Sequence, residues 1–151
     1  MSRRFVFELA AVLEQRTRIE RDAQGVLAAL QRERQAIEDQ LADLRRGVEA
    51  DRQAARDLMV GRVLAASLRE HVAGELGADR RARELALKLA GVQRRIEKAR
   101  EALRQASVQR QAIESLRDRR LAAWKQEQER SERLEIDDLM VMRRGRDARE
   151  G

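Results

Sequence analysis

The sequence contains no proline in 151 residues, and this absence most strongly limits the folds open to the chain. Proline removes a backbone donor and breaks or kinks a helix interior, so no residue of this kind interrupts the chain. Charged residues make up 40% of the sequence and aromatic residues only 2%, too few for a core built on aromatic side chains. A composition rich in Ala, Leu, Glu, Arg and Gln is typical of long helices. We therefore expect an all-α protein.

Two stretches carry apolar residues at alternating steps of three and four, the heptad pattern of coiled-coil helices. The first seam comprises Leu9, Val12, Arg16, Ile19, Ala23, Val26, Leu30, Arg34, Ile37, Leu41, Leu44, Val48, Asp51, Ala55 and Leu58. Two consecutive steps of four meet at Leu30, which predicts a stutter that locally unwinds the supercoil. The second seam comprises Leu85, Leu89, Val92, Ile96, Ala99, Leu103, Ala106, Arg110 and Ile113, and it loosens through Leu116 and Leu121 to Trp124.

Four members of these seams are polar: Arg16, Arg34, Asp51 and Arg110. Polar residues at core positions weaken a coiled coil but can specify its register. The pattern is equally compatible with a loose, marginally stable coil.

Between the seams, the stretch "DLMVGRVLAASLREHVAGELGADRRAR" contains Gly61, Gly74 and Gly77, and "GADR" offers a glycine stop followed by an aspartate cap. This pattern predicts a reversal bridged by a short helix around residues 63–72. The expected fold is a long antiparallel two-helix coiled-coil hairpin with a short helical connection near the middle. As one domain, 1–151, it divides into a helix at 5–58, a reversal with a short helix at 59–79, a helix at 80–142 and a basic flexible tail at 143–151.

The three aromatic residues, Phe5, Phe7 and Trp124, would gather at the open end of such a hairpin. On a continuous helix, Phe5 and Phe7 would diverge by about 200°, so one is expected to pack against Trp124 or Leu121 and the other to point outward. The group is either a packing plug that prevents fraying or an anchor for a partner.

The residues needed for catalysis are scarce. His71 is the single histidine and the chain has no cysteine, so no metal cluster or nucleophilic triad is expected. No glycine-rich phosphate-binding motif occurs. Asp137 and Asp138 would point about 100° apart on a helix and could not share a proton or a metal ion easily. We expect a protein that is not an enzyme and has no cofactor.

Neither a membrane span nor a signal peptide is predicted, because no apolar run approaches the required length. A cytoplasmic location is the default expectation. The net charge of +6 arises from 33 basic and 27 acidic residues that are interleaved, which favours an ion-paired helix surface and no nucleic-acid partner. A basic helical protein that binds nucleic acid or an anionic membrane surface is a third-ranked alternative, and steep salt dependence would reveal it.

The opening stretch "FVFELAAVLEQRTRIERDA" resembles the start of the FliJ family of flagellar type III export proteins. The matching positions are two spaced aromatics followed by leucines, an arginine and a glutamate: Phe5, Phe7, Leu9, Leu13, Arg16 and Glu20. The stretch "ERLEIDDLMVMRRGR" resembles the family's acidic, leucine-bearing end followed by arginines, here with Glu135, Asp137, Asp138 and Leu139. The resemblance covers essentially the whole chain.

This resemblance implies a central stalk similar to the antiparallel coiled coil of a rotary ATPase. The implied partners are a hexameric flagellar export ATPase, the cytoplasmic domain of the membrane export gate, and export chaperones, at the cytoplasmic face of the inner membrane. The residues expected to bind the ATPase are Phe5, Phe7, Leu9, Leu13, Arg16, Glu20, Asp137, Asp138, Leu139 and Met142. The residues expected to bind the gate are Leu64, Leu68, Val72 and Leu76, where Val72 and Leu76 stand in a zone that carries aromatics in some members.

Two alternatives remain at this point. The chain could be a self-associating structural coiled-coil scaffold, or the equivalent stalk of a virulence type III secretion system. A stalk is expected to be a monomer when free, whereas a scaffold would be an obligate dimer.

Overall fold

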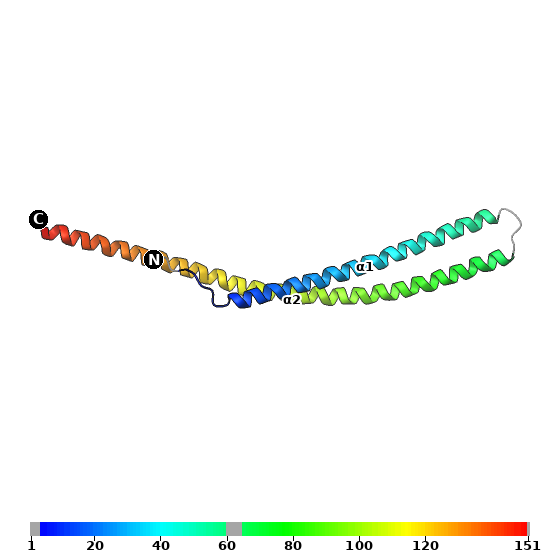
Figure 1. Ribbon diagram of the computed structural model, residues 1–151, viewed down its shortest axis with the longest axis horizontal. Helices are drawn as coiled ribbons and strands as arrows, with labels where there is room; N and C mark the ends of the chain where they lie inside the picture. The colour runs from blue at the N-terminus through cyan, green and yellow to red at the C-terminus, as the bar shows by residue number, and fades with distance from the viewer. Residues whose placement is uncertain (1–3, 60–64, 151) are drawn as a thin grey trace. The chain divides into compact units, whose positions relative to one another are not determined.

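The computed structural model describes residues 4–59 and 65–150. Helix α1 spans Ala10–Leu58 and helix α2 spans Ala65–Glu150 (Figure 1). No strand occurs in either described range. The chain is an all-α helical hairpin, as expected from a sequence without proline.

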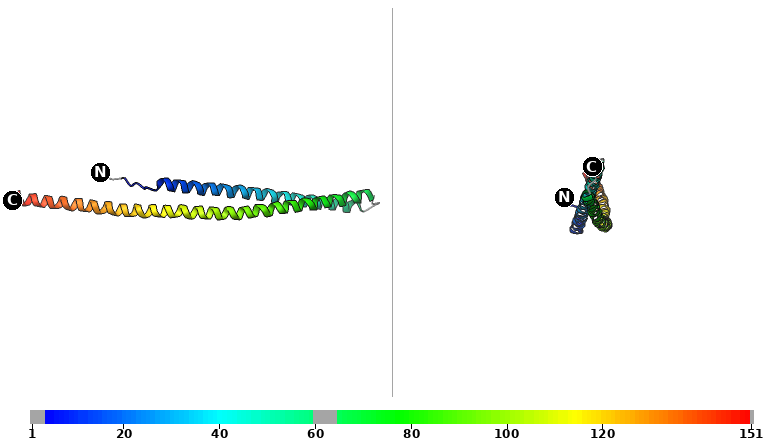
Figure 2. Two further views of the ribbon diagram at one scale, coloured as in Figure 1. Left: turned by 90° about the horizontal axis from the view of Figure 1, so that it is seen from below. Right: turned by 90° about the vertical axis from the view of Figure 1, so that its right-hand side faces the viewer.

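The hairpin divides into two units, and one of them comprises Arg21–Gln105. Within this unit α1 and α2 lie side by side, as two views show (Figures 1 and 2). Arg52 pairs with Glu75, and nearer the start of α1 Glu33 pairs with Arg95. The partner on α2 therefore moves towards the C-terminus as the position on α1 moves towards the N-terminus, so the two helices are antiparallel.

The core of this unit is a narrow apolar seam. Ile37 of α1 and Leu85, Val92 and Ile96 of α2 are buried, and flanking leucines pack against them: Leu27, Leu30, Leu41, Leu44 and Leu89. A seam of this kind holds two helices together through one apolar stripe on each, while the remaining surface stays charged and exposed.

The second unit comprises Met1–Glu20 and Ala106–Gly151. Residues 4–9 precede α1 and are not helical, and the Ala10 N–H donates to the Phe7 carbonyl at 3.1 Å. The first helical turns of α1 contact α2 through Arg16 and Glu20. The predicted helix start at residue 5 is therefore wrong by five residues.

The register of α1 differs from the predicted one in its first third. Ile19 and Val26 were assigned to the seam, yet they are 40% and 56% exposed. Glu20 is buried instead, and Leu27 packs against the core. With Glu20 and Leu27 in place, the steps of three and four alternate without interruption, so the predicted stutter at Leu30 is not needed. A search for apolar residues passes over a buried glutamate, and this is why it chose Ile19 and Val26 in place of their neighbours Glu20 and Leu27.

The seam of α2 agrees with the prediction and extends further. Leu85, Val92, Ile96, Ala99 and Ala106 are buried. The same spacing continues towards the start of α2 through half-buried residues: Ala82, Ala78, Glu75 and His71.

The reversal differs from the expectation of a separate short helix. The described residues from Ala65 onward belong to α2, and the helix passes through Gly74, Gly77 and Asp79 without a break. No described glycine has a positive φ, so Gly77 does not form a helix stop. Gly61 and Val63 lie outside the described residues.

The structure also differs from the expected flexible tail at 143–151, because the helix α2 continues to Glu150. Within the described residues, no helix is long and apolar enough to cross a membrane.

Candidate interaction surfaces

The non-helical segment before α1 brings both phenylalanines onto α2. The Phe5 and Trp124 rings lie 5.9 Å apart between centroids and are tilted by 56°. The Arg120 guanidinium lies 6.0 Å from the centre of the Phe7 ring, within the range of a cation–π contact. Val6, between them, is exposed. The prediction that one phenylalanine points outward is wrong, because it assumed a helix. In this non-helical segment the two side chains, two residues apart, both reach α2.

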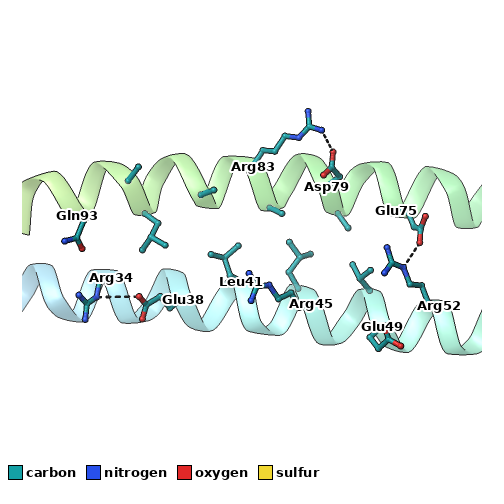
Figure 3. Close-up of a pocket in the computed structure, with 17 residues that line it drawn as sticks. Arg34, Glu38, Leu41, Arg45, Glu49, Arg52, Glu75, Asp79, Arg83 and Gln93 are labelled. Atoms are coloured by element: carbon teal, nitrogen blue, oxygen red, sulfur yellow. Dashed lines mark hydrogen bonds and ion pairs between the residues drawn. The ribbon is translucent and has the colours of Figure 1, made fainter.

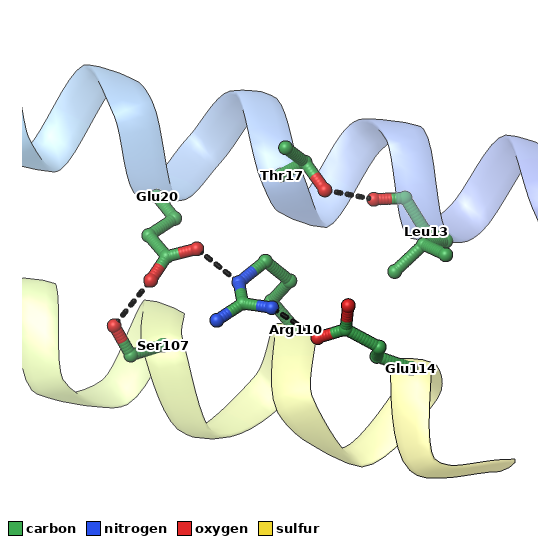
Figure 4. Close-up of polar contacts among 6 residues, drawn as sticks. All are labelled: Leu13, Thr17, Glu20, Ser107, Arg110 and Glu114. Carbon is green, nitrogen blue, oxygen red and sulfur yellow. Dashed lines mark hydrogen bonds and ion pairs between the residues drawn. The ribbon is translucent and has the colours of Figure 1, made fainter. Parts of the chain in front are cut away.

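A polar cluster lies where α1 meets α2 in the same unit (Figure 4). The Ser107 hydroxyl and the Arg110 Nε both donate to the carboxylate of Glu20, and Arg110 Nη1 donates to Glu114. Glu20 is buried, with 9% of its surface exposed. One buried carboxylate from α1 is thus held by two side chains of α2.

The pKa of Glu20 lies below its ordinary value of 4.5. The hydrogen bond from Ser107 is the largest cause, burial opposes it, and Arg110 contributes through both its hydrogen bond and its charge. Glu20 is therefore ionised at neutral pH, with its charge directed at α2.

Arg16, another residue near the start of α1 that is expected to bind a partner, also contacts α2. Arg16 Nη1 donates to Gln109 at 2.6 Å, while Leu9 and Leu13 are half-buried. The Leu13 carbonyl accepts a hydrogen bond from the Thr17 hydroxyl at 2.8 Å. The structure thus brings Phe5, Phe7, Arg16 and Glu20 into contact with α2, and Leu9 and Leu13 are half-buried in the same stretch.

The C-terminal part of α2 is exposed on every side, and apolar side chains lie around its whole circumference among charged ones. Asp137 and Asp138 are exposed, while Leu139 and Met142 are 63% and 69% exposed. Four more exposed apolar residues accompany them: Leu134, Ile136, Met140 and Val141. Successive helical positions turn by about 100°, so these six side chains are distributed around the whole helix. We call residues 134–146 the C-terminal segment.

The predicted gate-binding residues fall in part on an exposed face at the start of α2. Leu64 lies outside the described residues. Leu68, Val72 and Leu76 are exposed, with Val72 at 49% and Leu76 at 65%. Because a step of four advances about 40° around a helix, this row slants away from the seam. Leu68 lines a groove of about 440 Å³ between α1 and α2, whereas Val72 and Leu76 do not.

A longer groove of about 1080 Å³ runs between the helices of the Arg21–Gln105 unit (Figure 3). Leu41, Leu44 and Val48 of α1 line it together with small residues of α2: Ala78, Ala82, Ala86 and Ala90. Ion pairs at its edge join Arg52 to Glu75 and Arg83 to Asp79. The alanine side chains of α2 are too short to fill the space between the two helices beside the leucines of α1, and the groove is the space that remains.

No group of three or more potential metal ligands occurs within residues 4–59 and 65–150. His71 is half-buried in the seam, with Nε2 3.7 Å from the Glu75 carboxylate.

Two features were missed by reasoning from the sequence. Glu20 was assigned to a partner and Arg110 to the seam, but their mutual contact was not predicted. The distribution of exposed apolar side chains around the whole circumference of the C-terminal segment was not recognised either. Its sequence signal was present: four consecutive apolar residues, 139–142, cannot all lie on one helix face.

The family model described as "Flagellar FliJ protein" matches residues 5–149 of the chain. No curated protein and no solved structure matches the chain.

Proposed function

Because this chain belongs to the FliJ family, and is thus a flagellar export-associated protein, we propose that it acts as the central stalk of a hexameric flagellar export ATPase. In this role it promotes assembly of the ATPase, couples it to the cytoplasmic domain of the export gate, and assists export chaperones. It works in the cytoplasm at the inner membrane and without a catalytic residue or cofactor of its own. The match to the flagellar family favours this role over the equivalent stalk of a virulence secretion system.

The observation that carries this proposal is the C-terminal segment. The apolar side chains of this segment lie around its whole circumference, so all of them can be covered only when protein surrounds the helix, because contact along one face would leave the others in water. The central opening of a ring can enclose a single helix in this way. Exposed arginines at 143, 144 and 146 follow the apolar residues and suit acidic side chains at the mouth of such an opening.

The residues at the start of the chain have a supporting role in this proposal. Phe5 and Phe7 are partly covered by Trp124 and Arg120, and Glu20 is buried against Ser107 and Arg110. We propose that they hold α1 against α2 next to the inserted segment, and that the exposed parts of Phe5 and Phe7 contact the ATPase. Residues 137, 138, 139 and 142 make the main contact.

The test is a pair of charge substitutions on the exposed apolar residues. Leu139→Asp with Met142→Asp is expected to weaken stimulation of the ATPase about tenfold or more, the effect typical of losing interface anchors. Leu87→Asp is the matched control, since Leu87 is a 76% exposed leucine of α2 in the other unit. ATPase rate is measured against added protein. Equal stimulation by the double variant and the control would contradict the stalk proposal.

We propose that the first turns of α2, which carry Val72 and Leu76, bind the export gate. Val72→Asp with Leu76→Asp is expected to weaken binding to the cytoplasmic gate domain while stimulation of the ATPase is retained, because both side chains are exposed and far along α2 from residue 139. Loss of both activities together, with helical content preserved, would argue against separate surfaces.

A further inference from the structure

The C-terminal segment is divided by charge into two halves. Its first half carries three acidic residues, Glu135, Asp137 and Asp138, and its second half carries three arginines, Arg143, Arg144 and Arg146. Between them lie four exposed apolar residues, 139–142. Among residues 4–59 and 65–146, whose side chains the structure describes, none of these six charged side chains takes part in an ion pair.

The spacing of these charges is self-complementary when the segment is reversed. A two-fold axis between Met140 and Val141 places Glu135 at the level of Arg146 in a second copy. The same axis places Asp138 at the level of Arg143, and it places Asp137 at the level of Arg144 on the outer side of each helix, away from the second copy. A parallel arrangement would instead place acid beside acid and arginine beside arginine, which is unfavourable.

One face of the segment has the apolar spacing that such a pair requires. Residues 135, 139, 142 and 146 follow steps of four, three and four, which is a heptad face. About the same axis, Leu139 faces Met142 of the second copy, and a Glu135–Arg146 pair lies at each end. The interface is isologous, so one surface serves both copies.

We propose that the C-terminal segment pairs with that of a second copy of this chain in an antiparallel, two-fold arrangement. The contact is about 17 Å long, given 1.5 Å per residue between Glu135 and Arg146. It is smaller than a standard stable interface, so the dimer is weak and forms above low micromolar concentration. The chain remains a monomer below that range.

Self-pairing covers Leu139 and Met142, the same side chains that the proposed function assigns to the ATPase. The free chain thus shields its exposed apolar segment from other contacts, and the ATPase displaces the second copy. This consequence rests on the proposed function. The pairing itself does not, and it is measured in the absence of the ATPase, so either can fail alone.

The first experiment is sedimentation velocity of the full chain between about 5 and 500 μM, a range chosen to span the affinity of a small interface. The average mass is expected to rise from 17.4 kDa towards twice that value. An acidic variant (R143E/R144E/R146E) and a basic variant (E135R/D137R/D138R) are each expected to stay monomeric alone and to dimerise when mixed. A wild-type chain that stays monomeric throughout, or a mixture that does, overturns the proposal.

Matched controls carry the same charge changes on exposed residues elsewhere in the same unit: R117E/R119E/R130E and D118R/E127R/E132R. They are expected to associate as the wild type does. Monomeric controls would show that net charge, and not the segment, governs association, and would overturn the proposal.

Orientation is measured on the same dimer with a spin label. The chain has no cysteine, so Glu127→Cys gives a single labelling site on an exposed position of α2. In the antiparallel arrangement the two labels lie about 40 Å apart along the helix axes, since the axis falls 13.5 residues beyond Glu127, or about 20 Å at 1.5 Å per residue. A distance of about 10 Å, the spacing of two parallel helices, would overturn the antiparallel arrangement.

Discussion

At the scale of single residues, Glu20 has the most informative position in the chain. It occupies a seam position where a coiled coil ordinarily has an apolar side chain, and it is buried there. Its carboxylate accepts from Ser107 and Arg110 of α2, so the charge is not left unpaired. A buried ion pair of this kind contributes little net stability but disfavours registers in which the charge has no partner. If α1 were shifted along α2 by one helical turn, Glu20 would be buried with no Arg110 opposite it to pair with its charge.

The lowered pKa of Glu20 predicts a specific pH dependence. The folded state holds this carboxyl ionised to lower pH than the unfolded state does, so unfolding takes up a proton. Its stabilising contribution is therefore present above the ordinary pKa of 4.5 and is lost as pH falls through the lower, folded-state value. In Glu20→Gln the new amide oxygen can still accept a hydrogen bond from Ser107. The melting temperature of this variant should therefore fall less between pH 7 and pH 3 than that of the wild type.

Thermal unfolding followed by circular dichroism measures this difference. Glu14→Gln is the matched control, because Glu14 is an exposed glutamate of the same helix. An equal acid-induced loss in the wild type and Glu20→Gln would contradict the assigned role of Glu20.

At the scale of elements, the continuity of α2 is the main departure from what the glycine pattern predicts. Glycine ends a helix when it adopts a positive φ, and none of the described glycines does so. A Cβ atom added to Gly77 would meet nothing within 4 Å. The glycine therefore lies in an ordinary helical turn, where it costs stability relative to alanine.

This conformation predicts that Gly77→Ala stabilises the protein. The expected gain is about 0.5–1 kcal/mol in the free energy of unfolding, the difference in helix propensity between the two residues. Chemical denaturation measures it. A loss of stability would show that Gly77 ends a helix after all, because alanine is strained at a left-handed stop.

At the scale of the whole molecule, the two units differ in how their helices are covered. The Arg21–Gln105 unit has buried side chains on both helices, including Ile37 and Ile96. In the other unit every residue of α2 from Glu129 to Arg146 is exposed. Isolated helices without packing are only marginally stable in water.

Hydrogen exchange is therefore expected to be strongly uneven along α2. Backbone amides around Leu85–Ile96 should exchange slowest, and amides of residues 134–146 should exchange orders of magnitude faster at low micromolar concentration. Mass spectrometry of peptides from the two regions measures the ratio. Equal protection in both regions would mean that the C-terminal segment is covered even at that concentration.

The fold class, the two seams over most of their length and the family could all be predicted from the sequence. These follow from local and periodic properties: no proline to break a helix, apolar residues every three or four positions, and the residues that resemble the family's two ends. The seam from Leu85 to Ile113 could be read in this way because nearly all its members are apolar.

Features that depend on a contact between residues far apart in the sequence could not be predicted and became visible in the folded chain. Glu20 looks like a surface residue until Ser107 and Arg110 lie opposite it, and choosing Ile19 over it displaced the register. Phe5 and Phe7 both reach α2 because α1 starts at Ala10, a boundary that no cap residue marks in the sequence. Burial of a charge is favourable only with its partner in place, and the position of that partner is not a local property of the chain.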